Sequence, residues 1–467
     1  MNNKINLIIK NGEICTSYSR FKADIAVDNQ KIVAIGDASH FPTAEKILDV
    51  KGKVILPGVI HTHNHWRDPG ATQKEDFTSG TACAAAGGIT TGFAMTNVTP
   101  EPWDRNTFEE WKKIAAPKCI IDYALYGGFG IESKVAVIPE LAKAGAIGIK
   151  VFNTMHVRAK YPYIPALSIT DHGQLFEIFE TCGQVGIPIT VHPDESDFVK
   201  YLVERDYISK GRTNPTAFKE SRDRGIMYGY GMVTGAYDCA LYSHITGAKL
   251  LILHIGYMMK EGYDLVRDAK EKGWDVHAEM EASPLFLTRE RSDSQGPFCN
   301  MSGSTDLEQG WKAMNDGTVD ITIIEHAPHT KEEIEPGWKD MWDSALGLMG
   351  SQEFLPLMLT SVNEGKTTLE NLVKLTSENP AKHFDIYPKK GSIQIGSDAD
   401  FTIVDLNKED VIKTEKMLTK SGWTNWDGYK VKGIPVYTIV RGTVVMENGK
   451  VIGKPGFGKL VTGPLSE

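Results

Sequence analysis

A strand-like apolar run, Val54-Ile55-Leu56, leads through Pro57-Gly58 into the stretch His61-Thr62-His63-Asn64-His65-Trp66-Arg67-Asp68-Pro69-Gly70. The histidines therefore come where a buried strand ends and a loop begins. Residues two apart in an extended segment point to the same side, so His63 and His65 can present both imidazoles to one metal ion. His61 is in the same phase, one pair further back, and is a candidate third ligand. A lone histidine is more often a packing residue, but alternate histidines beside Arg-Asp-Pro-Gly favour a metal site.

The composition limits the classes of protein to which the chain can belong. Its 467 residues have room for one barrel-sized domain and a smaller one, and 41% hydrophobic residues can supply both cores. The formal net charge is -9 and no long Lys/Arg run occurs, which argues against nucleic-acid and anionic-membrane partners. The six cysteines are scattered singly, as Cys15, Cys83, Cys119, Cys182, Cys239 and Cys299. This spacing argues against a zinc ribbon or a disulfide framework and fits a reducing compartment.

The N-terminal segment Met-Asn-Asn-Lys-Ile-Asn has no signal-peptide apolar core. No apolar run reaches the length of a transmembrane helix. We therefore expect a soluble cytoplasmic protein.

Both ends of the chain contain short runs of residues with the composition of β-strands. The expected strands are residues 6–10, 24–27, 31–35, 399–405 and 436–445, several of them separated by Asn-Gly or Asp-Asn turns. We expect residues 1–56 and 388–467 to form one small β-sandwich domain from both termini.

The segment between them, residues 57–387, alternates short apolar runs with longer amphipathic stretches. The apolar runs include residues 147–152, 187–191, 250–253 and 321–324, and the amphipathic stretches include 171–182 and 368–375. The alternation of predicted strands and helices, and the length of the segment over which it continues, predict an α/β fold, a (β/α)₈ TIM-like barrel.

Four chemically capable residues lie in or directly after separate predicted strands. Lys150 is inside one apolar run, and His192, His254 and Glu325 each follow another. The carboxyl ends of all strands of a (β/α)₈ barrel converge on one mouth, where active sites lie. We therefore expect these residues to meet His63 and His65 there.

The expected cluster has the ligands of a divalent metal centre. His63, His65, His192, His254 and Glu325 offer nitrogen and oxygen atoms suited to zinc, and one ion needs only three or four of them, so the surplus favours two ions over a mononuclear site. Lys150 is a poor ligand as an ammonium. As an N-carboxylated carbamate it could bridge two metals, whereas unmodified it would be a structural or substrate-binding cation.

A hydroxide shared by two divalent ions can attack an amide, while the ions polarise the carbonyl of that amide. Glu325 could take the proton from the attacking water and deliver it to the leaving nitrogen. The alternative for Glu325 is a surface carboxylate before a loop, which its place directly after a strand disfavours.

At these residues the chain resembles the amidohydrolase superfamily, and within it the cyclic-amide hydrolases that include dihydroorotase, hydantoinase and allantoinase. The resemblance covers nearly the whole chain. The matching segments are Pro57-Gly58 before His63-Asn64-His65, Gly145 to Lys150, His192, His254, Glu281-Ala282-Ser283-Pro284, Asn379-Pro380-Ala381 and Gly396 to Asp400. It implies that His63, His65, carboxylated Lys150, His192 and His254 are the metal ligands, and that Glu325 takes the place of the catalytic, metal-binding aspartate. It also implies a homo-oligomer, a dimer or a tetramer.

The first barrel segments are most similar to the dihydroorotase branch. The similarity lies in residues 65–70, 74–76, 87–91 and 95–97. It implies that Arg67, Asn97 and His329 hold a substrate carboxylate, for which a guanidinium fork with two further donors is suited. The structural alternatives are a salt bridge from Arg67 to a neighbour such as Asp68, and a turn role for Asn97.

The chain also departs from that branch. His61 and Glu325 stand where aspartates are usual, and the added methylene of Glu325 can displace its carboxylate by about 1 Å. The Pro-Pro-Leu-Arg element is replaced by residues 299–306, which leaves dihydroorotate in question as the substrate. The alternatives are a hydantoinase-like or allantoinase-like hydrolase of another cyclic ureide or lactam, and a non-catalytic scaffold. Tyr161-Pro162-Tyr163 could line a substrate lid or form a loop without substrate contact.

Overall fold

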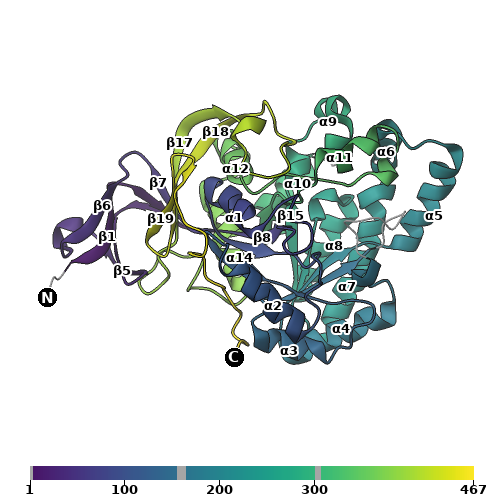
Figure 1. The fold of residues 1–467 in the computed structure, drawn as a ribbon, viewed down its shortest axis with the longest axis horizontal. Coiled ribbons are helices and arrows are strands. Elements are labelled where there is room, and N and C mark those ends of the chain that lie inside the picture. Colours follow the sequence, from purple (N-terminus) through teal and green to yellow (C-terminus); the bar gives the residue numbers. More distant parts are fainter. Residues whose placement is uncertain (1–3, 155–164, 300–306) are drawn as a thin grey trace.

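Eight parallel strands form a closed barrel at the centre of the molecule. The computed structural model describes residues 4–154, 165–299 and 307–467 (Figure 1). The barrel strands are β8 (Val59–Asn64), β9 (Ile89–Ala94), β10 (Asp122–Leu125) continued by β11 (Gly127–Gly128), β12 (Ile149–Asn153), β13 (Ile189–Pro193), β14 (Leu250–Ile252), β15 (Val276–Glu281) and β16 (Ile321–Ile323). Each strand pairs in parallel with the next, and the parallel bridge between Asn64 and His326 joins the last strand to the first. The predicted (β/α)₈ barrel is confirmed.

Helices follow the strands and surround them (Figure 1). The helices between successive strands, and after the last, are α1 (Phe77–Ala86), α2 (Arg105–Ala115), α3 (Val137–Ala144), α4 (His172–Val185), α7 (Gly231–Thr246), α8 (Lys260–Glu271), α10 (Leu307–Asn315) and α12 (Phe354–Asn363). Additional helices are α5 (Ser196–Asp206), α6 (Pro215–Asp223), α9 (Arg289–Gln295), α11 (Lys331–Ile334), α13 (Leu369–Val373) and α14 (Asn379–His383).

Local sequence signals set where these helices begin and end. The carboxylate of Asp76 accepts the backbone N–H of Ser79 at 2.8 Å, and the Ser79 hydroxyl accepts the Asp76 N–H at 3.1 Å, so the two residues form a capping box at the start of α1. Helix α4 begins after Asp171 in a similar way and ends at Gly186, whose φ of 78° suits glycine. The strands between the helices are buried on both faces, which is why they are continuous apolar runs.

Strands from both ends of the chain lie together beside the barrel (Figure 1). One sheet has the order β20 (Lys450–Val451), β19 (Thr443–Glu447), β18 (Lys430–Val440), β17 (Phe401–Val411), β7 (Val54–Pro57), β2 (Glu13–Cys15), β3 (Arg20–Lys22). A second has the order β5 (Lys31–Gly36), β4 (Asp24–Asp28), β1 (Ile5–Lys10), β6 (Ala44–Asp49). Buried residues of both sheets, Ile9, Ile25, Phe401 and Ile439 among them, form one apolar cluster. The boundaries of the small domain stay a prediction.

The C-terminal region differs from the expectation in two ways: a hairpin replaces the single strand expected at 436–445, and residues 412–429 follow a path that the sequence did not predict. The strand is broken into a hairpin at Arg441 and Gly442, both at positive φ, because these two residues form the turn between β18 and β19. Residues 412–429, which we call the strap, leave the sheet between β17 and β18 and return to the barrel. The indole N–H of Trp423 donates to the carbonyl of His329 at 2.7 Å, and that of Trp426 donates to the carbonyl of Met349 at 2.6 Å.

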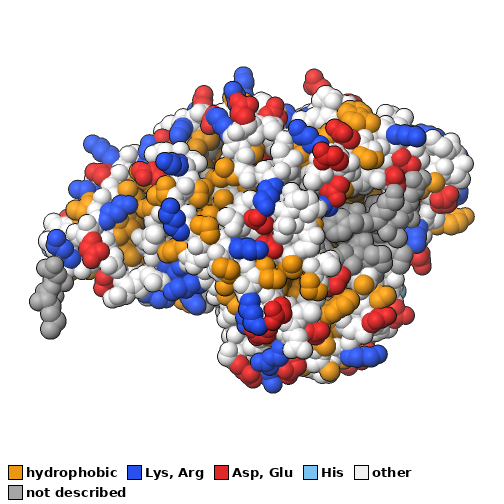
Figure 2. All heavy atoms as spheres, viewed as in Figure 1, with side chains coloured by type: hydrophobic (Ala, Val, Ile, Leu, Met, Phe, Trp, Pro, Cys, Tyr) orange, Lys and Arg blue, Asp and Glu red, His pale blue; other side chains and the backbone are white. Residues whose placement is uncertain are grey.

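The surface carries charges of both signs. Figure 2 shows Lys and Arg side chains interspersed with Asp and Glu over the face in view, with hydrophobic patches between them. None of the helices in the described part of the chain combines the length and apolar character needed to cross a membrane.

Candidate metal centre

The ends of the barrel strands open into a cavity. Its wall includes five of the six expected metal ligands, His63, His65, His192, His254 and Glu325. The sixth, Lys150, is fully buried in β12. The structure therefore brings together residues that lie far apart in the sequence, as their positions at strand ends predict.

His63, in β8, and His65, directly after β8, face the carboxylate of Glu325, which follows the neighbouring strand β16. The distance from His65 Nε2 to Glu325 Oε1 is 2.9 Å, and the distance from His63 Nε2 to the same oxygen is 3.6 Å. The rings of His63 and His65 are 5.3 Å apart between centroids, and His254 lies 4.8 Å from His63. His192 continues the cluster at 4.7 Å from His254. The four imidazoles and one carboxylate thus form one continuous group.

Burial sets the protonation of the group. It lowers the pKa of Lys150 to about 7, of His192 to about 3 and of His65 to about 4. For Glu325, burial alone would raise the pKa, but the facing histidines outweigh it and hold the pKa well below its usual range. At neutral pH His65 and His192 are therefore neutral and Glu325 is ionised, which is the state in which these groups bind metal ions.

Three buried nitrogen atoms of the group fit a bound metal pair. The Nζ of Lys150, Nε2 of His192 and Nδ1 of His254 have no hydrogen-bond partner within the described residues. Buried polar groups are normally paired, because an unpaired one costs about 1–3 kcal/mol. Neutral imidazoles beside a carboxylate are also the donor set that zinc prefers.

Two side chains orient the first pair of histidines. The Nδ1–H of His63 donates to Glu279 at 2.9 Å, and the Nδ1–H of His65 donates to the amide oxygen of Asn97 at 2.5 Å. Each bond leaves Nε2 directed at Glu325. Glu279, in β15, also accepts a hydrogen bond of 2.8 Å from the Thr62 hydroxyl.

Glu279 was not expected from the sequence. The only feature of the sequence that could have indicated it is a carboxylate within a strand, two residues before Glu281. Glu281 lies in one of the segments that resemble the family, but its contact was not expected: it accepts the backbone N–H of Glu325 at 3.2 Å and so holds the backbone of that residue. Burial raises the pKa of Glu281 to about 8.

The three residues expected to hold a carboxylate have different positions. Arg67 and Asn97 line the cavity. His329 is fully buried behind Arg67, with 3.1 Å between Arg67 Nη2 and His329 Nε2, and its Nδ1 lies 3.2 Å from Glu333 and 3.3 Å from Lys74. The amide oxygen of Asn97 already accepts from His65. All three groups are thus engaged with other parts of the protein, Arg67 with His329 and with the carbonyl of Pro328 at 3.3 Å.

His61 lies away from the cluster. Its Nε2 donates to the carbonyl of Ile324 at 2.9 Å, and its ring packs edge-on against Phe354. Burial lowers its pKa to about 3. His61 therefore occupies a packing position rather than that of a third ligand. Tyr161-Pro162-Tyr163, the possible substrate lid, lies outside the described residues, as do residues 300–306 of the segment 299–306 that replaces the Pro-Pro-Leu-Arg element.

The remaining wall of the cavity is mostly apolar and aromatic. It is formed by Phe152, Leu167, Tyr228, Tyr257 and Leu346. The guanidinium of Arg222 lies 5.4 Å from the ring centroids of both Tyr228 and Tyr257, a distance at which a cation attracts the ring face. The cavity thus joins a cluster of metal ligands to a hydrophobic compartment.

Known proteins resemble nearly the whole chain in sequence and in fold. The family model described as Amidohydrolase family matches residues 54–445. The L-hydantoinase of Paenarthrobacter aurescens is 33% identical over 463 residues, 98% of each protein, and a dihydroorotase of Methanosphaera stadtmanae is 32% identical over 96% of this chain and 97% of its own. The solved L-hydantoinase (dihydropyrimidinase) from Arthrobacter aurescens matches with a TM-score of 0.91 and 32% identity, covering 98% of this chain and 100% of that structure.

Proposed function

Because the chain belongs to the amidohydrolase family, as the match over residues 54–445 shows, we propose that it opens the ring of a hydantoin-type cyclic ureide that carries an apolar substituent. Its relatives named above are enzymes of cyclic amides, and the chain is a hydrolase of carbon–nitrogen bonds in cyclic amides. The observation that carries the finer proposal is the apolar wall of the cavity beside the histidine cluster.

We propose that His63, His65, Lys150, His192, His254 and Glu325 hold two divalent ions, most suitably zinc, with Lys150 N-carboxylated. When bound, such ions lower the pKa of water towards neutrality and polarise an amide carbonyl. The buried nitrogens of Lys150, His192 and His254, which have no hydrogen-bond partner within the described residues, support this assignment.

The protein's own residues then have distinct tasks. Glu325, whose carboxylate faces the histidine cluster in the cavity wall, can accept the proton of the attacking water and donate it to the leaving ring nitrogen. Glu279 and Asn97 hold the imidazoles of His63 and His65 in one tautomer. The aromatic wall excludes bulk water and receives the ring substituent.

A carboxylate-bearing substrate of the dihydroorotate type is the second candidate. Arg67 supports it, because its guanidinium lines the cavity and can pair with a carboxylate. The engagement of Asn97 with His65, and of His329 with Glu333 and Lys74, makes it the weaker candidate.

Turnover of a panel of substrates by the zinc-loaded protein tests the proposal. We expect kcat/KM for 5-benzylhydantoin to exceed that for unsubstituted hydantoin by about 10-fold or more, since burying an apolar side chain contributes about 1.5–3 kcal/mol. A preference for dihydroorotate would reject the hydantoin proposal in favour of the second candidate, and a preference for allantoin would reject both. A protein that binds no metal ion after reconstitution and turns over none of these would be a non-catalytic homologue.

We further propose that the chain forms a dimer or a tetramer in the cytoplasm. An exposed apolar row on and beside α7, formed by Tyr230, Tyr237, Leu241 and Ile245, supports self-association. The six cysteines, all buried and free, fit a reducing compartment. Light scattering coupled to gel filtration tests the oligomeric state, and a monomer at micromolar concentration would reject it.

A further inference from the structure

The two sides of the metal centre meet where the barrel closes. His63 and His65 are on and directly after β8, and Glu325 follows β16. His326 joins them: its N–H donates to the carbonyl of His63 at 3.2 Å, and its carbonyl accepts the N–H of His65 at 2.8 Å. One peptide segment therefore sets the separation between Glu325 and both histidines.

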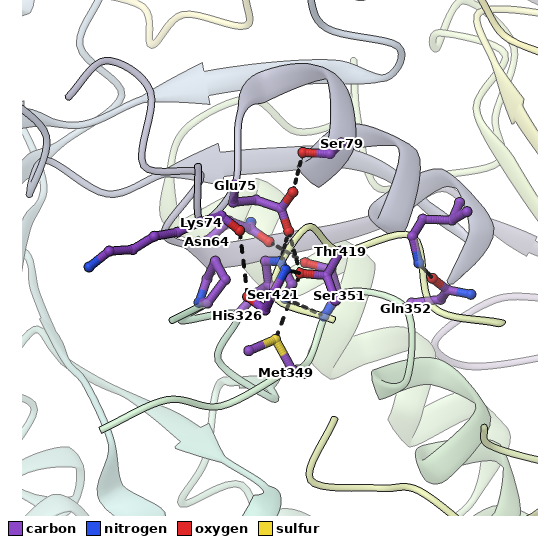
Figure 3. A network of polar contacts seen from close by, with 12 residues as sticks. Asn64, Lys74, Glu75, Ser79, His326, Met349, Ser351, Gln352, Thr419 and Ser421 are labelled. Atoms are coloured by element: carbon purple, nitrogen blue, oxygen red, sulfur yellow. Dashed lines mark hydrogen bonds and ion pairs between the residues drawn. The ribbon is translucent and has the colours of Figure 1, made fainter. Parts of the chain in front are cut away.

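The side chain of His326 is buried in a polar network (Figure 3) and is not among the residues that line the cavity. Its Nδ1 accepts the backbone N–H groups of Gly350 at 3.4 Å and Ser351 at 3.5 Å. Because Nδ1 is the acceptor, the ring proton is on Nε2, which donates to the carboxylate of Glu75 at 3.2 Å. Ser351 also donates to the side chain of Asn64 at 2.8 Å, which ties the same segment to β8.

Glu75 is the anchor of this network. Its side chain is fully buried and lies between His326, Thr419 and Ser79 in Figure 3. The hydroxyl of Thr419, in the strap, donates to the carboxylate at 2.7 Å, and the hydroxyl of Ser79, in α1, donates to its other oxygen. A buried carboxylate is stable only when it is fully hydrogen-bonded, and a fully bonded network of this kind is rigid.

We propose that Glu75 is a positioning residue for the hydrolytic reaction, acting through His326 to fix Glu325 relative to His63 and His65. Glu75 does not touch the cavity, and its contact with the catalytic segment passes through one imidazole. The proposal rests on the proposed function of the cavity. A displacement of about 1 Å in such a site can lower the rate on the order of 100-fold.

Two substitutions of Glu75 test it. Glu75→Leu removes all of its hydrogen bonds, and we expect kcat to fall about 100-fold per folded, zinc-loaded site with KM changed less than about 3-fold. Glu75→Gln keeps an acceptor for His326 and Thr419, so we expect it to restore kcat to within about 5-fold of the wild type. A folded Glu75→Leu protein with wild-type kcat, or a folded Glu75→Gln protein as slow as Glu75→Leu, would overturn the proposal.

Glu353 offers a matched control. It is also a buried carboxylate bonded to a strap threonine, with the hydroxyl of Thr424 donating to it at 2.7 Å, but it makes no hydrogen bond to His326. Glu353→Leu should lower the unfolding temperature as Glu75→Leu does and leave kcat unchanged.

Zinc retention against a chelator gives a readout that needs no substrate. We expect Glu75→Leu to lose zinc at least about 10-fold faster than Glu353→Leu. Equal retention and equal kcat in the two variants would reject the positioning role. A difference in retention in a protein inactive on every cyclic amide would instead reject only the proposed function.

Discussion

At the scale of single residues, Lys150 has the least ordinary surroundings. Its ammonium position is fully buried, and burial lowers its pKa to about 7, so much of the side chain is a neutral amine at neutral pH. A neutral amine can add carbon dioxide: the Nζ–C bond forms, one proton is released and an anionic carbamate results. Such a carbamate would turn the residue from a poor metal ligand into a good one.

Substitution of Lys150 should separate this role from that of a structural cation. We expect Lys150→Ala to lower kcat/KM by at least about 100-fold and to lose zinc, with partial recovery in millimolar acetate or propionate, whose carboxylate can replace the carbamate. Lys150→Arg keeps the positive charge but forms no carbamate. Activity close to the wild type in Lys150→Arg would contradict carboxylation.

The residues whose clustering the sequence predicts well are those whose position follows from the local strand pattern. His63, His65, His192, His254 and Glu325 lie at strand ends, and a barrel necessarily brings strand ends together. Glu279 could not be chosen over Glu281, because both are carboxylates on the same face of one strand. The contact of Glu75 with His326 joins residues 251 positions apart and leaves no local pattern.

At the scale of elements, the segment that leads into α12 approaches β16 more closely than side chains allow. A Cβ added to Gly350 would lie 1.9 Å from the carbonyl oxygen of Ile324 and 2.6 Å from that of Glu325. Glycine is therefore required here by the close approach of two backbones.

Gly350→Ala should push the end of β16 out of place. We expect a fall in kcat of at least about 10-fold together with a lower unfolding temperature, because the clash falls on Ile324 and on Glu325, the proposed catalytic carboxylate. Gly36→Ala is the control, since its added Cβ would meet only one atom, at 4.0 Å. Kinetics and thermal unfolding of both variants check this, and unchanged kcat in Gly350→Ala would contradict it.

His277, near the start of β15 and at the other end of this strand from Glu279 and Glu281, is a titrating group. Burial alone would lower the pKa of His277, but Asp275, at 2.9 Å, and Asp320, at 3.3 Å, outweigh it and raise the pKa from its usual 6.5 to about 9. Because the pKa is higher in the folded state, the protonated ring stabilises the fold fully below about pH 6.5. This contribution is lost as the pH rises through about 9.

The pH dependence of unfolding checks this assignment. Between pH 6.5 and 9 the wild-type free energy of unfolding should decline relative to that of His277→Gln, which lacks the titrating ring. The two proteins should differ most at the acidic end of this range. Parallel curves for the two proteins in urea titrations would contradict it.

The sequence predicts the bounds of helices and strands best where the apolar pattern is uninterrupted. Residues 436–445 looked like one strand because Arg441 and Gly442 interrupt an otherwise apolar run without an Asn-Gly or Pro signal. The strap has no periodicity, and its tryptophans carry no sequence signal for their partners, the carbonyls of His329 and Met349. Tertiary contacts alone determine its path.

At the scale of the whole molecule, a buried ion cluster joins the barrel to the β-rich region. Lys390 lies 2.5 Å from Asp122 at the start of β10, 3.1 Å from Asp398 and 2.7 Å from Asp400. Arg441, at the turn between β18 and β19, also pairs with Asp122. These charges are almost completely buried, so removing one leaves the others uncompensated.

Lys390→Met should therefore destabilise the protein by about 3–5 kcal/mol. Lys31→Met removes a half-exposed partner of the same Asp398, 2.6 Å away, and should cost no more than about 1 kcal/mol. Urea unfolding followed by circular dichroism checks both. A cost for Lys390→Met as small as that for Lys31→Met would contradict the role of the cluster.

The sheet that unites both ends of the chain also has a consequence for biosynthesis. Strand β7 pairs with β17, residues 54–57 against residues 401–404, so one edge of β7 leaves the ribosome long before its partner is made. At roughly 10 residues per second the wait is about half a minute. During that time Ile55 and Leu56, which are fully buried in the finished protein, lack the strand that covers them and are open to association with other nascent chains.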